Sequence, residues 1–144
     1  MKLSKQISQG RFWTEHYGGV FKSRFKVIWT TQRHKPVLKR DIKKRLEELI
    51  RKALEDFCLE LGRLNIRPSQ VEIIFTTTNP YLSVAQIVSS IKRDSSGILM
   101  KEFEDQLRER SKLPTLWNMA YLAVPVSEFS KKIGKNFIEA QKGR

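Results

Sequence analysis

The chain has 144 residues, of which 40% are hydrophobic and 30% charged; this size and balance fit one globular domain and exclude an intrinsically disordered chain. The chain has 28 lysine and arginine residues against 15 aspartate and glutamate residues, a formal charge of +13. This excess favours a polyanionic partner, with nucleic acid as the leading candidate. The alternative is a basic composition that reflects no partner. The sequence has neither an apolar run long enough to span a membrane nor the apolar stretch of a signal peptide, so we expect a cytoplasmic protein with no membrane partner.

The N-terminal part divides into an extension and the start of a domain. Residues 1–20 have no clear hydrophobic period, so we predict an N-terminal extension at 1–20 and a domain at 21–144. From Phe21 to Thr31 hydrophobic and polar residues alternate, which predicts a half-buried strand. A basic loop follows and is broken by Pro36.

A helix is predicted after this loop. Asp41 can cap it, its apolar residues recur every three or four positions as far as Leu61, and Gly62 is a natural stop. Cys58 falls on the apolar stripe, so we expect a buried thiol that forms no internal disulfide.

Two short β-like runs come next, at 63–67 and 70–78, and the turn residues between them predict a hairpin. Ser83 can then cap a second helix, whose apolar stripe continues towards Phe103.

The last predicted elements are a strand at 116–126 and a helix that Ser127 can cap. The full order is strand, helix, strand, strand, helix, strand, helix. This order predicts an α+β fold, namely a ferredoxin-like split β-α-β antiparallel sheet with helices on one face and an added C-terminal helix.

Several short segments carry a family resemblance through their order and spacing. They are 25–31 with 33–38, 64–68 with Val71, 95–103, 116–121 and 137–141. Together they resemble the IS200-like transposases, also called single-tyrosine HUH transposases, over roughly residues 20–142. The resemblance implies DNA as the partner, and a homodimer, because family members pair through their sheets.

The chemistry of this family depends on three residues that the chain lacks. Family members cut single-stranded DNA with a tyrosine nucleophile and a divalent metal, which is held by two histidines one residue apart on a strand. Gln70 and Glu72 stand at the histidine positions, and Phe137 stands at the tyrosine position. Phenylalanine has no nucleophilic oxygen, so the resemblance implies that attack from this position is lost.

A weak metal site remains an open alternative. Gln141 matches a family glutamine that also reaches the metal, and Glu72 with Gln70 could add oxygen ligands for Mg²⁺ or Mn²⁺. Because only one of these ligands is charged, the favoured interpretation is a polar surface bonded to water or to itself.

Basic residues supply the candidate nucleic-acid contacts. Those that match basic positions near DNA in the family, or that surround the last helix, are Arg33, Lys35, Lys92, Arg93, Lys131, Lys132 and Lys135. For any one of them, a solvated surface charge is an equally good interpretation.

These observations lead to one functional hypothesis and two alternatives. The hypothesis is a non-catalytic transposase homologue that binds single-stranded or hairpin DNA, with RNA as the other candidate nucleic acid. The first alternative is an active transposase or nuclease in which Tyr17, Tyr81 or Tyr121 is a displaced nucleophile assisted by a divalent metal. The second is a repurposed fold that serves protein interaction, with its basic charge incidental.

Overall fold

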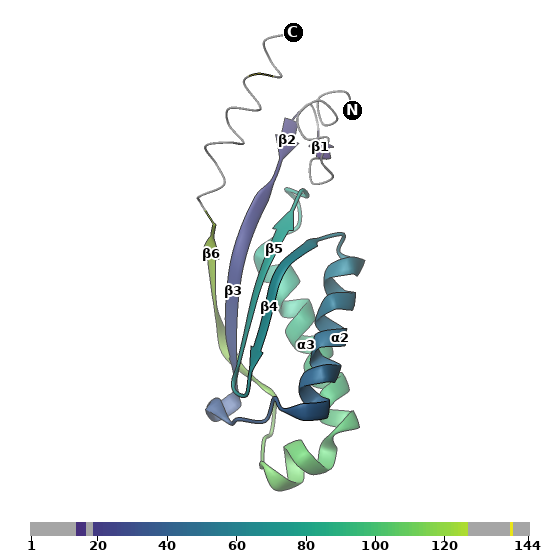
Figure 1. Ribbon diagram of the computed structural model, residues 1–144, viewed down its shortest axis with the longest axis vertical. Coiled ribbons are helices and arrows are strands. Elements are labelled where there is room, and N and C mark those ends of the chain that lie inside the picture. The colour runs from purple at the N-terminus through teal and green to yellow at the C-terminus, as the bar shows by residue number, and fades with distance from the viewer. Residues whose placement is uncertain (1–13, 17–18, 127–138, 140–144) are drawn as a thin grey trace.

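The computed structural model describes residues 14–16, 19–126 and 139 (Figure 1). Its elements in chain order are β1 (Thr14–His16), β2 (Gly19–Phe21), β3 (Ser23–Thr31), the 3₁₀ turn η1 (Gln32–His34), α2 (Arg40–Asp56), β4 (Glu60–Arg67), β5 (Gln70–Thr77), α3 (Val84–Glu102), the π-helical turn η2 (Asp105–Arg110) and β6 (Trp117–Pro125). Among these, no helix is long and apolar enough to cross a membrane.

Four strands form one antiparallel sheet in the order β4-β5-β3-β6. The chain leaves β3, passes through α2 and returns as β4, with β5 occupying the place between them; this is the split β-α-β connection. Both α2 and α3 lie on the same face of the sheet (Figure 1). The predicted ferredoxin-like α+β class is therefore confirmed for the described residues.

Strands β1 and β2 pair with each other in a separate two-stranded ribbon. The predicted boundary between an extension and a domain, after residue 20, falls inside β2. The predicted C-terminal helix from Ser127 lies outside the described residues, apart from Glu139, which is helical.

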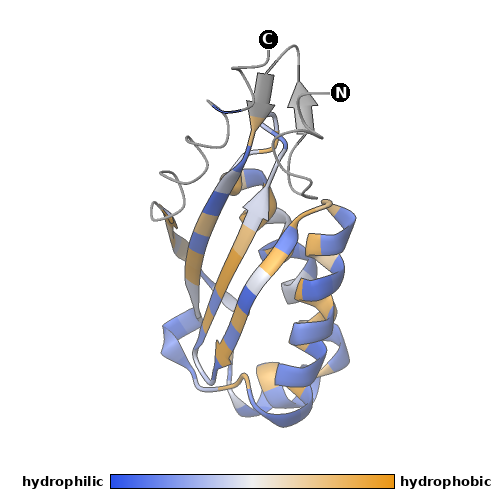
Figure 2. Ribbon diagram, turned by 45° about the horizontal axis from the view of Figure 1, so that its top comes forward, coloured by the Kyte–Doolittle hydropathy of each residue, from blue (hydrophilic) through white to orange (hydrophobic). Residues whose placement is uncertain are grey.

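The strands alternate because one face of the sheet is buried under the helices. Along β5, every second residue is almost fully buried, and the buried ones are Val71, Ile73, Phe75 and Thr77. The residues between them are half-buried and lie on the opposite face, which no described helix covers. Figure 2 shows the alternation as blue and orange bands along the strands. We call this second surface the open face.

The first helix ends earlier than predicted. It stops at Asp56 rather than at Gly62, because the backbone turns into the left-handed region at Cys58, with φ 57°. Cys58 is consequently exposed, so the prediction of a buried thiol was wrong. Gly62 instead lies inside β4, where the pairing with β5 slips by one residue between Leu61 and Arg63.

The predicted N-cap of α3 is confirmed, whereas the predicted N-cap of α2 is wrong. Ser83 caps α3 as predicted, and it forms a capping box with Gln86, in which each side chain bonds the other's backbone N–H. The N-cap of α2, however, is Lys39, which provides no side-chain cap; Asp41 lies in the first turn instead.

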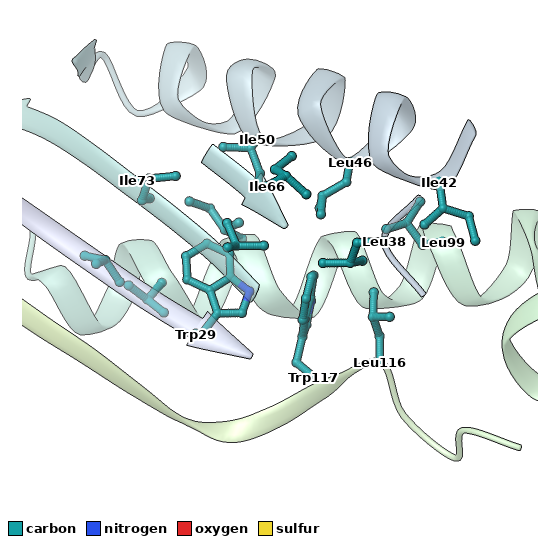
Figure 3. Packing of buried hydrophobic residues seen from close by; sticks show 14 of the residues in the cluster. Trp29, Leu38, Ile42, Leu46, Ile50, Ile66, Ile73, Leu99, Leu116 and Trp117 are labelled. Carbon is teal, nitrogen blue, oxygen red and sulfur yellow. The ribbon is translucent and has the colours of Figure 1, made fainter. Parts of the chain in front are cut away.

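The core fills the space between the sheet and the two helices. Trp29 on β3 and Trp117 on β6 meet edge to face, with ring centroids 5.9 Å apart (Figure 3). Leu46 and Ile50 of α2 and Leu99 of α3 lie against them from the helix side. Packing against the helices buries most of this face of the sheet, so the accessible parts of the sheet are the open face, its edges and its loops.

Candidate nucleic-acid interface

Gln70 and Glu72, which the sequence predicts at the family's histidine positions, lie together on the open face. Gln70 and Glu72 alternate with Val71 along β5, and Val71 is completely buried in the core. Their side chains therefore share the face away from the helices, as the strand spacing predicts. The other two positions of the predicted site, Phe137 and Gln141, lie outside the described residues.

Two cations from neighbouring strands converge on Glu72. Lys26 of β3 places Nζ 3.8 Å from Oε2, and Arg63 of β4 places Nε 4.0 Å from Oε1. The register explains this arrangement: both basic residues pair with Ile74, one on each side, so Glu72 occupies the next row between them. The Glu72 side chain is only 13% exposed, whereas Lys26 and Arg63 are 41% and 64% exposed.

These surroundings do not fit a divalent metal site. A Mg²⁺ or Mn²⁺ ion on Glu72 would be placed close to two positive side chains, and that repulsion opposes binding. Within the described part of the chain, histidine, cysteine, aspartate and glutamate nowhere gather in the groups of three that could hold a metal. Gln70 contributes at most a neutral carbonyl oxygen. We therefore derive no chemistry from a metal at this position.

A basic loop is fixed at the end of the sheet where β5 begins. The backbone N–H of Thr31 donates to the carbonyl of Ser69 at 3.0 Å, and the hydroxyl of Thr31 donates to the carbonyl of Lys35 at 2.7 Å. His34 also contacts the hydroxyl of Ser69 through Nδ1, at 3.3 Å. The loop that carries the predicted contacts Arg33 and Lys35 is thus attached to the β4–β5 turn.

The backbone of this loop presents its basic side chains outward. Arg33 and His34 are both in the left-handed region, with φ of 55° and 56°, and both side chains are exposed. Arg67, the last residue of β4, pairs with Gln70 beside the same turn and is also exposed. Sequence patterning did not single out Arg67, because only the hairpin brings it to this end of the sheet.

The predicted contacts Lys92 and Arg93 are adjacent on α3 but have different surroundings. Lys92 donates through Nζ to the carbonyl oxygens of Asn118 at 2.7 Å and Met119 at 3.1 Å, with Ala120 at 3.4 Å. Burial lowers the pKa of the Lys92 ammonium. Arg93 is 74% exposed and is paired with its neighbour Asp94. Lys92 therefore holds the start of β6, whereas the charge of Arg93 faces solvent.

The strand that Lys92 holds is an edge of the four-stranded sheet and contains a bulge. Trp29 pairs with Tyr121, but Thr31 pairs with Trp117, so four steps along β6 match two steps along β3. The extra residues project outward, and Met119 is 93% exposed. Leu122, further along, is 57% exposed.

The described tyrosines do not face Gln70 and Glu72. Tyr121 pairs with Trp29, whose side chain is in the core, so the Tyr121 ring is on the helix side of the sheet. The Tyr121 side chain is 41% exposed, so it is not a buried core residue. Tyr81 lies beyond the far end of β5 from Gln70, a strand that spans about 25 Å. Tyr17 lies outside the described residues, as do Lys131, Lys132 and Lys135.

The split β-α-β sheet with two helices on one face defines a ferredoxin-like α+β domain. Residues 19–141 match the family described as transposase IS200 like, and the chain belongs to this family.

Individual relatives agree with this assignment. The chain is 24% identical to the ISDra2 transposase TnpA of Deinococcus radiodurans over 139 residues, covering 96% of this chain and 94% of that protein. It is also similar to the crystal structure of a transposase from Deinococcus radiodurans R1, with 25% identity, a TM-score of 0.71 and coverage of 89% of this chain and 97% of the other. The structure of a REP-associated tyrosine transposase bound to a REP hairpin shares the fold, with 13% identity, a TM-score of 0.54 and coverage of 90% and 74%.

Proposed function

We propose that this member of the IS200-like transposase family binds single-stranded or hairpin DNA without cutting it. The observation that carries the proposal is the state of the open face, where Gln70 and Glu72 replace the metal-binding histidines and Glu72 is paired with two cations. Phe137 at the tyrosine position removes the nucleophile that the family uses. Binding is the part of the family's activity that needs none of these residues.

The net charge of the chain and its similarity to known transposases both support DNA as the partner. The net charge of +13 provides the long-range attraction that phosphate backbones require. A structural neighbour, the REP-associated tyrosine transposase, is bound to a REP hairpin. The exposed side chains of Arg33 and Arg67 and the half-buried side chain of Lys35 form a basic cluster to which a phosphate backbone could bind. RNA has the same backbone charge, so it is the comparison ligand in the test below.

We further propose a homodimer that pairs through β6. This strand is an edge of the sheet, and its exposed apolar side chains, Met119 and Leu122 among them, suit burial against a second copy. Action in the cytoplasm remains a prediction from the sequence.

The decisive experiment incubates the full chain with labelled hairpin oligonucleotides in Mg²⁺ or Mn²⁺. Denaturing gels detect covalent adducts and cut products, and anisotropy detects binding. We expect salt-sensitive binding with neither an adduct nor a cut. The triple variant Gln70→His, Glu72→His, Phe137→Tyr serves as the comparison, because it restores the family's residues at the three positions.

Two results would contradict the proposal in different ways. An adduct formed by the unaltered chain would show that a displaced nucleophile, such as one of the other tyrosines, is active. The absence of salt-sensitive binding to DNA or RNA at low ionic strength would instead favour a role in protein interaction.

A further inference from the structure

The open face carries more positive than negative charge. On this face, β3 presents Arg24 and Lys26, β4 presents Glu60, Arg63 and Arg67, and β5 presents Glu72. Three of the four basic side chains are accessible, since Arg63 and Arg67 are exposed and Lys26 is 41% exposed. These six charged residues therefore have a net positive charge.

The position of Arg63 on this face depends on the bulge at Gly62. Leu61 pairs with Phe75 and Arg63 pairs with Ile74, so one extra residue is accommodated in β4. If β4 continued from Leu61 in regular register, without the bulge, Arg63 would pair with Ile73 and point into the core, because a one-residue slip exchanges the two faces of a strand. The bulge leaves little room for a side chain, since a Cβ at Gly62 would lie 3.3 Å from the backbone carbonyl oxygen of Ile74 and 2.9 Å from Nη2 of the flexible Arg24 side chain.

The hydrogen-bond donors of Lys26 and Arg63 are not used by Glu72, so they can bind a ligand. Their distances of 3.8 and 4.0 Å exceed the 2.7–3.2 Å range of N–H···O bonds, so the carboxylate attracts both groups without accepting a hydrogen bond from either. Glu72 thus restrains Lys26 and Arg63 on either side of Ile74. An ammonium and a guanidinium held in this way are suitable donors for one phosphate.

From this geometry we infer that Lys26 and Arg63 bind a backbone phosphate of single-stranded DNA on the open face, in place of the divalent metal of active family members. The two side chains supply the positive charge that a metal would otherwise supply, and Glu72 sets their spacing. The site binds DNA equally well with and without Mg²⁺. This inference rests on the proposed DNA-binding function and assigns it to a particular surface.

The test measures binding of a labelled hairpin oligonucleotide with a single-stranded flank, by anisotropy, in EDTA and in Mg²⁺. At about 50 mM salt, Lys26→Gln and Arg63→Gln should each weaken binding about tenfold, and each should lower the slope of log K against log salt by about one. Glu72→Gln should tighten binding, because it removes the negative charge beside Lys26 and Arg63. Chelation should leave the affinity of the unaltered chain unchanged.

A matched control changes the total charge by the same amount as Lys26→Gln. Lys52→Gln removes one positive charge from α2, on the helix side of the sheet, where Lys52 is 75% exposed and paired only loosely with Asp56 at 3.8 Å. It should lower affinity far less than Lys26→Gln. Thermal melts of all variants verify that they are folded.

The possible failures can be told apart. If the unaltered chain binds but Lys26→Gln and Arg63→Gln behave like Lys52→Gln, DNA binding stands and its assignment to the open face is wrong. If chelation abolishes binding, the replacement of the metal by side chains is wrong. If the unaltered chain binds no DNA at all, the proposed function fails together with this inference.

Discussion

The indole Nε1 of Trp117 donates a hydrogen bond to the hydroxyl of Ser95, 3.0 Å away, and both residues are buried. Ser95 in turn donates to the carbonyl of Ile91, one turn earlier in α3, at 2.6 Å. A single hydroxyl therefore connects the start of β6 to the middle of α3. It also satisfies an indole N–H that has little access to water.

Removal of this hydroxyl should destabilise the fold. Ser95→Ala leaves the Trp117 N–H buried without an acceptor, so the free energy of unfolding should fall by about 1–3 kcal/mol. Urea denaturation measures the change. Ser89→Ala, an exposed position on the same helix, is the control and should be neutral or slightly stabilising. Equal effects of the two variants would show that the hydrogen bond adds nothing.

Lys92 should affect stability more than DNA affinity. Lys92→Met keeps most of the apolar stem but removes the ammonium that binds the carbonyls of Asn118 and Met119. The free energy of unfolding should fall by about 1 kcal/mol, and amide hydrogen exchange at the start of β6 should accelerate. Arg93→Met should leave stability nearly unchanged. If Lys92→Met reduces the favourable free energy of DNA binding by more than it reduces the free energy of unfolding, Lys92 contacts a phosphate instead.

Gly97 in α3 and Gly62 in β4 should respond oppositely to alanine. Gly97 lies in α3, and a Cβ there would meet nothing within 4 Å, so Gly97→Ala should stabilise the protein by about 0.5–1 kcal/mol. Gly62→Ala should destabilise it, since the Cβ would lie 3.3 Å from the carbonyl oxygen of Ile74 and closer still to Arg24. Thermal unfolding compares the two, and stabilisation by Gly62→Ala would show that the bulge tolerates a side chain.

The basic loop should contribute to DNA affinity through phosphate contacts that are independent of Lys26 and Arg63. Changing Arg33 and Lys35 together to glutamine should weaken binding to all sequences alike and lower the salt slope by about two. Salt titrations of the double variant measure this. An unchanged slope would place these residues away from the phosphates.

The β6 edge should control the oligomeric state. Met119→Glu with Leu122→Glu introduces two charges where a second copy would bury apolar surface, so the proposed dimer should dissociate. Sedimentation velocity measures the mass in solution. A monomer before substitution would refute the proposed pairing.

The local pattern of the sequence was enough to predict most of the fold. The alternation ahead of Thr31, the hairpin turn near Pro68 and the Ser83 cap are short-range signals, and the structure confirms all three. The end of α2 was missed because the apolar spacing from Phe57 to Leu61 suits a helix and a strand equally well. The left-handed residue that separates them, Cys58, is not a glycine and gave no signal.

The surroundings of Glu72 could not be predicted in the same way. That Gln70 and Glu72 share a face follows from their spacing alone. The approach of Lys26 and Arg63 depends on which strands are neighbours and on the slip at Gly62. Pairing partners and bulges are tertiary features that no periodicity within one segment contains.

Both outer strands of the sheet have an irregularity, and this limits how the protein can associate. In β4 it falls between Leu61 and Arg63, and in β6 it precedes Tyr121. A sheet that grows by edge-to-edge addition needs two regular edges. Only the part of β6 from Tyr121 to Pro125 keeps a regular register with β3, and β4 has Arg63 and Arg67 exposed along its length. The fold can therefore accept one partner strand while resisting the open-ended stacking that produces fibres.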